Sequence, residues 1–148
     1  MLVSTDLTPN EIPLHHKESS HLHLNGQVIY IKSLNMYLTI AHHHYNLLGG
    51  RTKFGNTYMS YFILFEAEEP WRIQYTSPAW CFASIDSSSG TSTTCDTIQF
   101  IMSTFQKADD DDALVISYGV NDCDGAVAEM SLQKVLDFTQ SLKVHTGI

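Results

Sequence analysis

The chain has few basic residues, and this shortage excludes two classes of partner. Its 148 residues include 8 Lys and Arg against 16 Asp and Glu, for a formal net charge of -8. Because nucleic acids and anionic membrane surfaces both require a basic face, we expect neither as a partner. The acidic run Asp109 to Asp112 lacks the spacing of a calcium-binding EF-hand loop, so it is interpreted as a solvated loop.

Apolar stretches long enough to span a membrane and cysteines in CxxC spacing are also missing. No apolar run approaches the roughly 20 residues that span a bilayer, and residues 1–18 lack a basic start followed by an apolar segment. The three cysteines, Cys81, Cys95 and Cys123, are odd in number and have no CxxC spacing, so a disulfide framework is not expected. These absences predict a soluble protein of a reducing, cytoplasmic compartment.

What the chain does contain is an apolar share of 43% and many aromatic residues, which suffice for the core of one domain. Gly, Asn and Pro punctuate short apolar runs in the manner of β-structure. Residues 1–20 are expected to be an irregular lead-in, and a short amphipathic helix is expected at about 132–142, with Ser131 as its cap. The strands are expected at 26–32, 36–43, 57–66, 71–76, 79–83, 97–105, 114–118 and 126–132.

These strands form two consecutive four-stranded meanders, which suggests two blades of a β-propeller. Blade one would occupy about 24–76 and blade two about 79–132, within a domain of residues 21–143. Two blades cannot close a ring, so their faces require partners. The chain is then part of a longer propeller, or it self-associates, or it packs as a two-sheet sandwich.

The segment 113–130 reads as a β-hairpin whose turn carries an amide and two carboxylates. Asn121, Asp122 and Asp124 lie between two β-rich runs, and such residues tolerate positive φ and bond to their own backbone. Two carboxylates in one turn cannot easily straddle a sugar ring, whereas an inverting glycosidase needs its two carboxyl groups about 6.5 to 9.5 Å apart on opposite faces. Building the turn is therefore favoured over catalysis.

Several segments together resemble the C-terminal half of the five-bladed β-propeller glycosidases, the mannoside phosphorylases and β-mannosidases of glycoside hydrolase family 130. Related propeller domains are attached to some glycosyltransferases. The resemblance covers roughly residues 20 to 132, with Ser103 standing where the family has Gly. The similar segments, in order, are Ile40-Ala41-His42, Leu64-Phe65-Glu66-Ala67-Glu68-Glu69-Pro70, Phe100-Ile101-Met102-Ser103 and Ser117-Tyr118-Gly119-Val120-Asn121-Asp122.

This resemblance implies a carbohydrate ligand of the mannoside type. It implies that His42 faces a central pocket, and that Asp122 bonds a sugar hydroxyl beside Tyr118 and Asn121. The catalytic acid of the family lies in an earlier blade, and no segment here resembles it. No catalytic residue and no cofactor are therefore assigned, and whether the chain is an enzyme stays open.

Two further groups of residues invite other functions. In a strand, His42 and His44 share a face while His43 points away, so only two ligands converge where a stable zinc site needs three or four. His21 and His23 could supply further ligands if their segment lay alongside. Surface or hydrogen-bonded histidines are nevertheless favoured over a metal site. The aromatic residues of 58–82 are interpreted as core. Trp80, beside a Ser/Thr-rich loop, is the best candidate for an exposed sugar-stacking ring.

The sequence thus predicts an all-β, propeller-like protein that binds or helps to process a mannoside-type carbohydrate. The alternative, from a different class, is a non-catalytic interaction module that associates through its blade faces. A truncated gene product without an activity of its own is the third interpretation.

Overall fold

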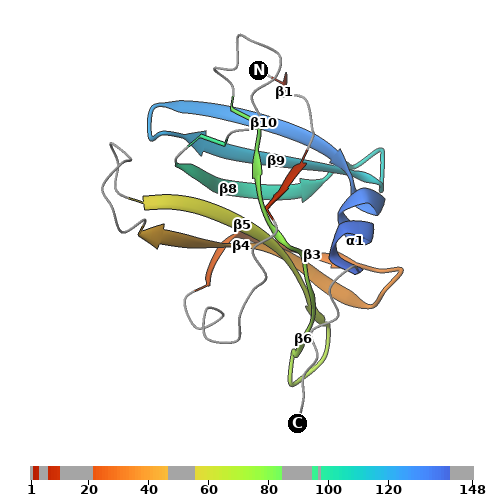
Figure 1. Cartoon of the computed structure of the whole chain (residues 1–148). Helices are drawn as coiled ribbons and strands as arrows, with labels where there is room; N and C mark the ends of the chain where they lie inside the picture. Colours follow the sequence, from red (N-terminus) through yellow and green to blue (C-terminus); the bar gives the residue numbers. More distant parts are fainter. Residues whose placement is uncertain are drawn as a thin grey trace.

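The described residues form two β-sheets and one short helix (Figure 1), which confirms the all-β class. The computed structural model describes residues 2–3, 7–10, 22–46, 56–84, 95–96 and 98–140. In chain order the elements are β1 (Leu2–Val3), β2 (Leu7–Asn10), β3 (His23–Ile31), β4 (Met36–Asn46), β5 (Asn56–Glu66), β6 (Ile73–Thr76), β7 (Ala79–Phe82), β8 (Gln99–Gln106), β9 (Ala113–Val120), β10 (Asp124–Ser131) and α1 (Leu132–Gln140).

The two sheets face each other across a shared core. One has the strand order β1-β10-β9-β8, and the other has the order β2-β7-β5-β4-β3, with β6 paired to β5. All pairings are antiparallel except that of β1 with β10. In Figure 1 the four-stranded sheet lies above the six-stranded one, and α1 stands beside them. Among the described residues neither sheet closes on itself.

The core forms because apolar residues recur at every second position of the central strands. On β4 and β5 the inward side chains are Leu38, Ile40, Phe62 and Leu64, and all four are fully buried. Each such side chain contributes about 1.5 to 3 kcal/mol on burial. Facing residues of the second sheet and the helix complete the core: Ile101, Leu114, Ile116, Tyr118, Val120, Ala126, Ala128, Met130, Leu132, Val135 and Leu136.

β5 is buried on both faces, which agrees with the interpretation of its aromatic residues as core. Its other face, with Met59, Tyr61 and Ile63, belongs to a second apolar cluster on the outer side of the six-stranded sheet. A strand buried on both faces needs apolar residues at consecutive positions rather than alternate ones. The aromatic residues of β5 are therefore mainly structural.

The expected irregular lead-in at residues 1–20 is wrong at Leu2–Val3 and Leu7–Asn10, which form strands, and the rest of it lies outside the described residues. β1 pairs with β10 and β2 pairs with β7, so this segment adds one strand to each sheet. Pro9 lies in β2, which is the end strand of its sheet, where a residue without an N–H group is tolerated. Strands of two and four residues are too short to show the alternation by which the longer ones were predicted.

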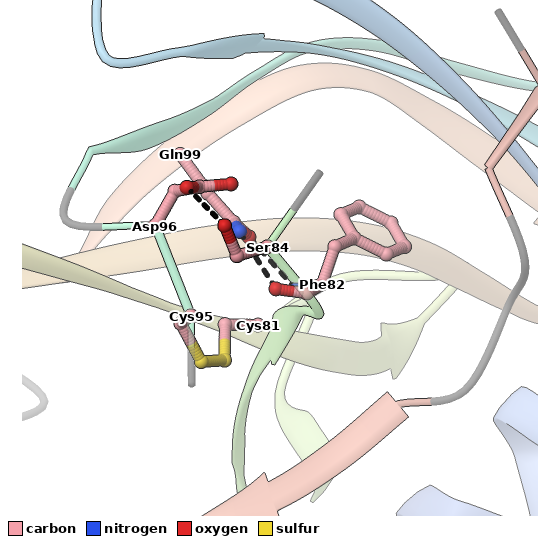
Figure 2. The surroundings of a disulfide bond; sticks show 6 residues. All are labelled: Cys81, Phe82, Ser84, Cys95, Asp96 and Gln99. Atoms are coloured by element: carbon pink, nitrogen blue, oxygen red, sulfur yellow. Dashed lines mark hydrogen bonds between the residues drawn. A yellow bond between two sulfur atoms is a disulfide. The ribbon is translucent and has the colours of Figure 1, made fainter. Parts of the chain in front are cut away.

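The expectation that the strand at 79–83 belongs to the second meander is also wrong. β7 belongs to the six-stranded sheet, where it pairs with β2 and meets β5 at Ser60 and Trp80. All four β7 residues are buried, as suits a strand with neighbours on both edges. β7 is joined to β8 by a side chain instead: the Phe82 N–H donates to Gln99 Oε1 (2.8 Å), and Gln99 Nε2 donates to the Phe82 carbonyl (2.7 Å; Figure 2).

The cysteine-based expectation of no disulfide is a further error, because Cys81 and Cys95 are bonded (Figure 2). Their Cα atoms are 5.9 Å apart, within the usual range for a disulfide. Beside the bond, Ala83 and Cys95 form an isolated antiparallel bridge, and Ser84 Oγ donates to Asp96 Oδ1 at 2.7 Å. The odd count arises because Cys123 is free and exposed.

The predicted C-terminal helix is confirmed as α1, and Ser131 caps it by accepting the Lys134 N–H at 3.3 Å. Asp112 adds a second cap, because its Oδ1 accepts the Gln133 N–H at 2.7 Å. Its hydrogen bonds to Ser131 and to the Gln133 backbone hold the pKa of this carboxyl below its usual value. Within the described ranges, no helix has the length and apolar character required to cross a bilayer.

Candidate functional site

The turn between β9 and β10 has the conformation that its Asx residues predict. Asn121 and Asp122 have φ values of 51° and 58°, and the Cys123 N–H donates to the Val120 carbonyl at 3.0 Å. Two successive residues of positive φ are the requirement of a type I′ hairpin turn. Asn121 is further fixed to Ile98, since it donates its N–H to the Ile98 carbonyl and accepts the Ile98 N–H on Oδ1.

Asp122 is exposed at the tip of this turn, where a ligand has free access to it. Asn121 is half-buried, and its side-chain oxygen is already used by the Ile98 N–H. Of the two predicted sugar contacts in the turn, Asp122 thus has the geometry of a binding group, while Asn121 holds the turn in place.

Tyr118, the third predicted contact, points into the core. It is 1% exposed and stacks on Phe82, with ring centroids 4.3 Å apart. Its hydroxyl has no hydrogen-bond partner in the described structure. Burial raises the pKa of this phenol, and the negative charge of Asp96 raises it further.

Tyr118→Phe should therefore leave stability at neutral pH unchanged or raise it by about 1 kcal/mol, because it removes a buried hydroxyl that forms no hydrogen bond. The wild type should lose more stability than the variant above about pH 10, where tyrosine ionises in the unfolded chain while the raised pKa keeps Tyr118 neutral in the fold. Urea titrations at pH 7 and pH 10.5 measure both effects. A variant destabilised by several kcal/mol at pH 7 would show that the hydroxyl is bonded after all.

His42, the fourth predicted contact, lies among polar and aromatic side chains at one end of the core. It is 5% exposed, and its Nδ1 is hydrogen-bonded to Asn25 Oδ1. Three rings surround it at centroid distances of 5.3 Å for His23, 5.4 Å for Tyr58 and 5.4 Å for Phe100. We call these five residues the His42 cluster.

The Asn25 side chain carries a polar atom that forms no hydrogen bond within the described part of the chain. Asn25 is 3% exposed, its oxygen contacts His42, and its Nδ2 has no partner among the described residues. Rotating the amide by half a turn would exchange the two atoms and leave the oxygen without a partner instead. Because buried polar groups are almost always bonded, an unused amide beside His42 indicates a place for a polar ligand group.

The His42 cluster and the β9–β10 turn are brought to the same end of the molecule through β8. Phe100, whose ring contacts His42, pairs with Gly119 on β9, two residues before Asn121. Phe100 is 43% exposed, so one face of its ring is accessible. This end therefore joins His42, an exposed aromatic ring and the Asp122 turn. The phenol of Tyr118 faces away from it into the core.

The histidine run gives no metal centre in the part of the chain that the structure describes. No group of three or more His, Cys, Asp or Glu residues is placed there to hold an ion. The prediction that His42 and His44 share a face stays a prediction, because the side chain of His44 lies outside the described part of the structure. His21 lies outside the described residues as well. His42 and His43 sit on opposite faces of β4, as expected from strand alternation.

An acidic hollow of about 240 Å³ lies at the start of α1, at the end of β9 and β10 opposite their turn. It is lined by Asp110, Asp112 and Glu129 together with Ala113, Met130 and Ser131. Its carboxylates already have partners: Asp110 accepts the Asp112 N–H, Asp112 caps α1, and Glu129 pairs with Lys107 at 2.7 Å. The expectation that the acidic run forms an exposed loop is confirmed.

Trp80 is not the exposed ring that the sequence suggested. It is fully buried, stacked on Phe62 at 4.5 Å and in edge contact with Phe82 at 5.2 Å. The exposed ring is supplied by Phe100 instead. The residues that sequence reasoning missed, Asn25 and Phe100, had weak signals: Asn25 precedes a glycine inside a strand pattern, which marks a bulge, and the register shifts there.

No family model matches the chain, and no curated protein matches it at a significant level.

Proposed function

We propose that this chain is the carbohydrate-binding part of a glycosidase-like β-propeller and that it binds a mannoside-type sugar at the His42 cluster. The observation that carries the proposal is the buried Asn25 amide, which has one polar atom without a partner beside His42. A sugar hydroxyl both donates and accepts, so it can bond to whichever amide atom is presented.

The surroundings of this amide suit a sugar. The exposed part of the Phe100 ring provides an apolar surface on which the C–H face of a pyranose can stack, and the Tyr58 ring also contacts His42. Asp122, exposed at the tip of the neighbouring turn, can accept hydrogen bonds from two hydroxyls. Apolar walls with a few convergent polar groups are the usual composition of a small-molecule site.

The propeller assignment rests on the order of the resembling segments, which include His42 and Asp122. The strands β3 to β6 form the expected four-stranded antiparallel meander, and β8 to β10 form three strands of the second. Because the chain has no segment resembling the catalytic acid of the family, the proposed activity is binding, with hydrolysis or phosphorolysis requiring an acid from elsewhere.

Titration of the isotope-labelled protein with mannose and mannobiose, followed by NMR, tests the proposal. Amide signals of β3, β4 and the β9–β10 turn should shift. Phe100→Ala should weaken binding about tenfold, since loss of a stacking ring removes on the order of 1.4 kcal/mol. Asp122→Asn, which keeps a residue tolerant of positive φ, should weaken it several-fold without altering the turn.

Phe105→Ala is the matched control, because Phe105 is another exposed phenylalanine of the same strand, at 46% against 43% for Phe100. Its affinity should equal that of the wild type. If neither sugar moves any signal, or if the two phenylalanine variants lose affinity equally, the His42 cluster is not the binding site.

A further inference from the structure

The outer face of the six-stranded sheet carries a row of large apolar side chains across four strands. Tyr30 on β3 pairs with Tyr37 on β4, Tyr37 pairs with Phe65 on β5, and Phe65 pairs with Ile73 on β6. Directly paired residues of antiparallel strands project from the same face. We call these four residues the outer row. Figure 1 shows its strands on the side of the molecule away from β8, β9 and β10.

The outer row is in contact within itself and open to solvent at both ends. The ring centroids of Tyr30 and Tyr37 are 5.5 Å apart, and those of Tyr37 and Phe65 are 5.4 Å apart. Tyr30 is 46% exposed and Ile73 is 45% exposed, with the two middle residues half-buried. On the same face Leu24 is 67% exposed. Contiguous apolar surface of this kind marks an interaction site more often than scattered apolar residues do.

The charges at the two ends of the outer row are opposite. Lys32 follows β3 at the Tyr30 end, while Glu68 and Glu69 lie in the turn before Arg72 and β6 at the Ile73 end. All are exposed, and within the described ranges the single ion pair is Lys107 with Glu129. The Ile73 end stays net acidic even with Arg72 counted. The basic end of the face on one copy of the chain can therefore attract the acidic end of the same face on another copy.

We propose that this face binds a second copy of the chain as a two-fold symmetric dimer. A two-fold axis parallel to the strands and lying between the faces places Tyr30 of one copy over Ile73 of the other. It brings Lys32 over Glu68 and Glu69 at both ends, and Tyr37 and Phe65 meet near the axis. An isologous interface requires a self-complementary patch, and the opposite charges at the ends of the row provide one.

This inference does not depend on the proposed function, because the outer row and the His42 cluster lie on opposite faces of β4. Sugar binding and dimerisation can fail independently. A sheet face also suits self-association in general, since two sheets pack about 10 Å apart through their apolar faces.

Sedimentation velocity of the full chain over a wide concentration range tests the dimer. The wild type should reach dimer mass. Tyr37→Glu should abolish the dimer, because it places a charge near the symmetry axis. Lys32→Glu should weaken the dimer about five-fold, and the Glu68→Lys, Glu69→Lys double variant should do the same. Combining all three reversals should restore an affinity within about two-fold of the wild type, since the charges are then merely exchanged.

Lys134→Glu is the matched control, because Lys134 is an exposed lysine on α1, and it should leave the dimer unchanged. Thermal unfolding of each variant confirms that it is folded. A wild type that remains monomeric at the highest concentration overturns the proposal, as does a dimer that Tyr37→Glu and the charge reversals leave intact.

Discussion

Replacing both Cys81 and Cys95 by alanine is expected to lower the free energy of unfolding by about 3 kcal/mol. The two cysteines are 14 residues apart, and closing a loop of about this length removes roughly that much free energy from the unfolded chain. For a chain of this size the melting temperature should fall by about 6 to 12 °C. Alanine is preferred to serine because Cys81 is 1% exposed, and a hydroxyl there would add its own cost.

Cys123→Ala supplies the control, since this cysteine is exposed and free. Its melting temperature should match that of the wild type, and a reducing agent should lower both to the level of the double variant. Equal melting temperatures for the oxidised and reduced wild type would show that the bond adds nothing to stability. Disulfides persist mainly in oxidising compartments, so thiol labelling of protein taken directly from cells also tests the expected cytoplasmic location.

Trp80→Ala is expected to cost about 3 to 5 kcal/mol, the usual range for deleting a fully buried aromatic side chain. Trp80 is 0% exposed and joins the stack of Phe62 to the ring of Phe82, which in turn stacks on Tyr118. Its removal leaves a cavity in the middle of the aromatic contacts that connect the two sheets. Against a typical total of about 5 to 15 kcal/mol, the loss is a large fraction of the stability and should clearly lower the midpoint of urea unfolding.

Trp80→Phe should cost less than half as much. It keeps a ring in the stack and removes an indole N–H that has no hydrogen-bond partner in the described structure. Trp71→Ala is the matched control, because the other tryptophan of the chain is 54% exposed and its loss should change stability by less than about 1 kcal/mol. Urea denaturation of the three variants ranks them. Similar costs for Trp71→Ala and Trp80→Ala would contradict the observed burial.

The strands from β3 to β6 and from β8 to β10 could be predicted because their residues alternate or run apolar over enough positions to identify them. The turn between β9 and β10 was as clear, because Asn121 and Asp122 adopt the positive φ that Asx residues between two strands tolerate. These are local properties, set by residues within a few positions of one another.

The partner of β7 could not be predicted, because it depends on one distant side chain. Four buried residues identify a strand, but nothing in them shows whether it joins β8 or β5. The Gln99 amide bonds to Phe82 in place of the main chain of β8, which places β7 with the other sheet. The same limit applies to Trp80, whose burial follows from that placement.

The candidate site was predicted in part. His42 and Asp122 were identified from the resemblance. Both lie at the same end of the molecule, where Phe100 contacts His42 and pairs with Gly119 just before the Asp122 turn. Asn25 could not be found, because its importance lies in a hydrogen bond to His42 across two strands and in an unused amide atom. Tyr118 was included because it precedes Gly119 in the matching segment, yet alternation along β9 turns its ring into the core.

The pairing of β1 with β10 affects the order in which the two sheets can fold during synthesis. Leu2 lies beside Val127, so β1 cannot pair until β10, far along the chain, has also been synthesised. The six-stranded sheet can be completed earlier, since β2 needs only β7. Contacts so distant in sequence slow folding, and the four-stranded sheet is therefore expected to be the last part of the molecule to acquire its native edge.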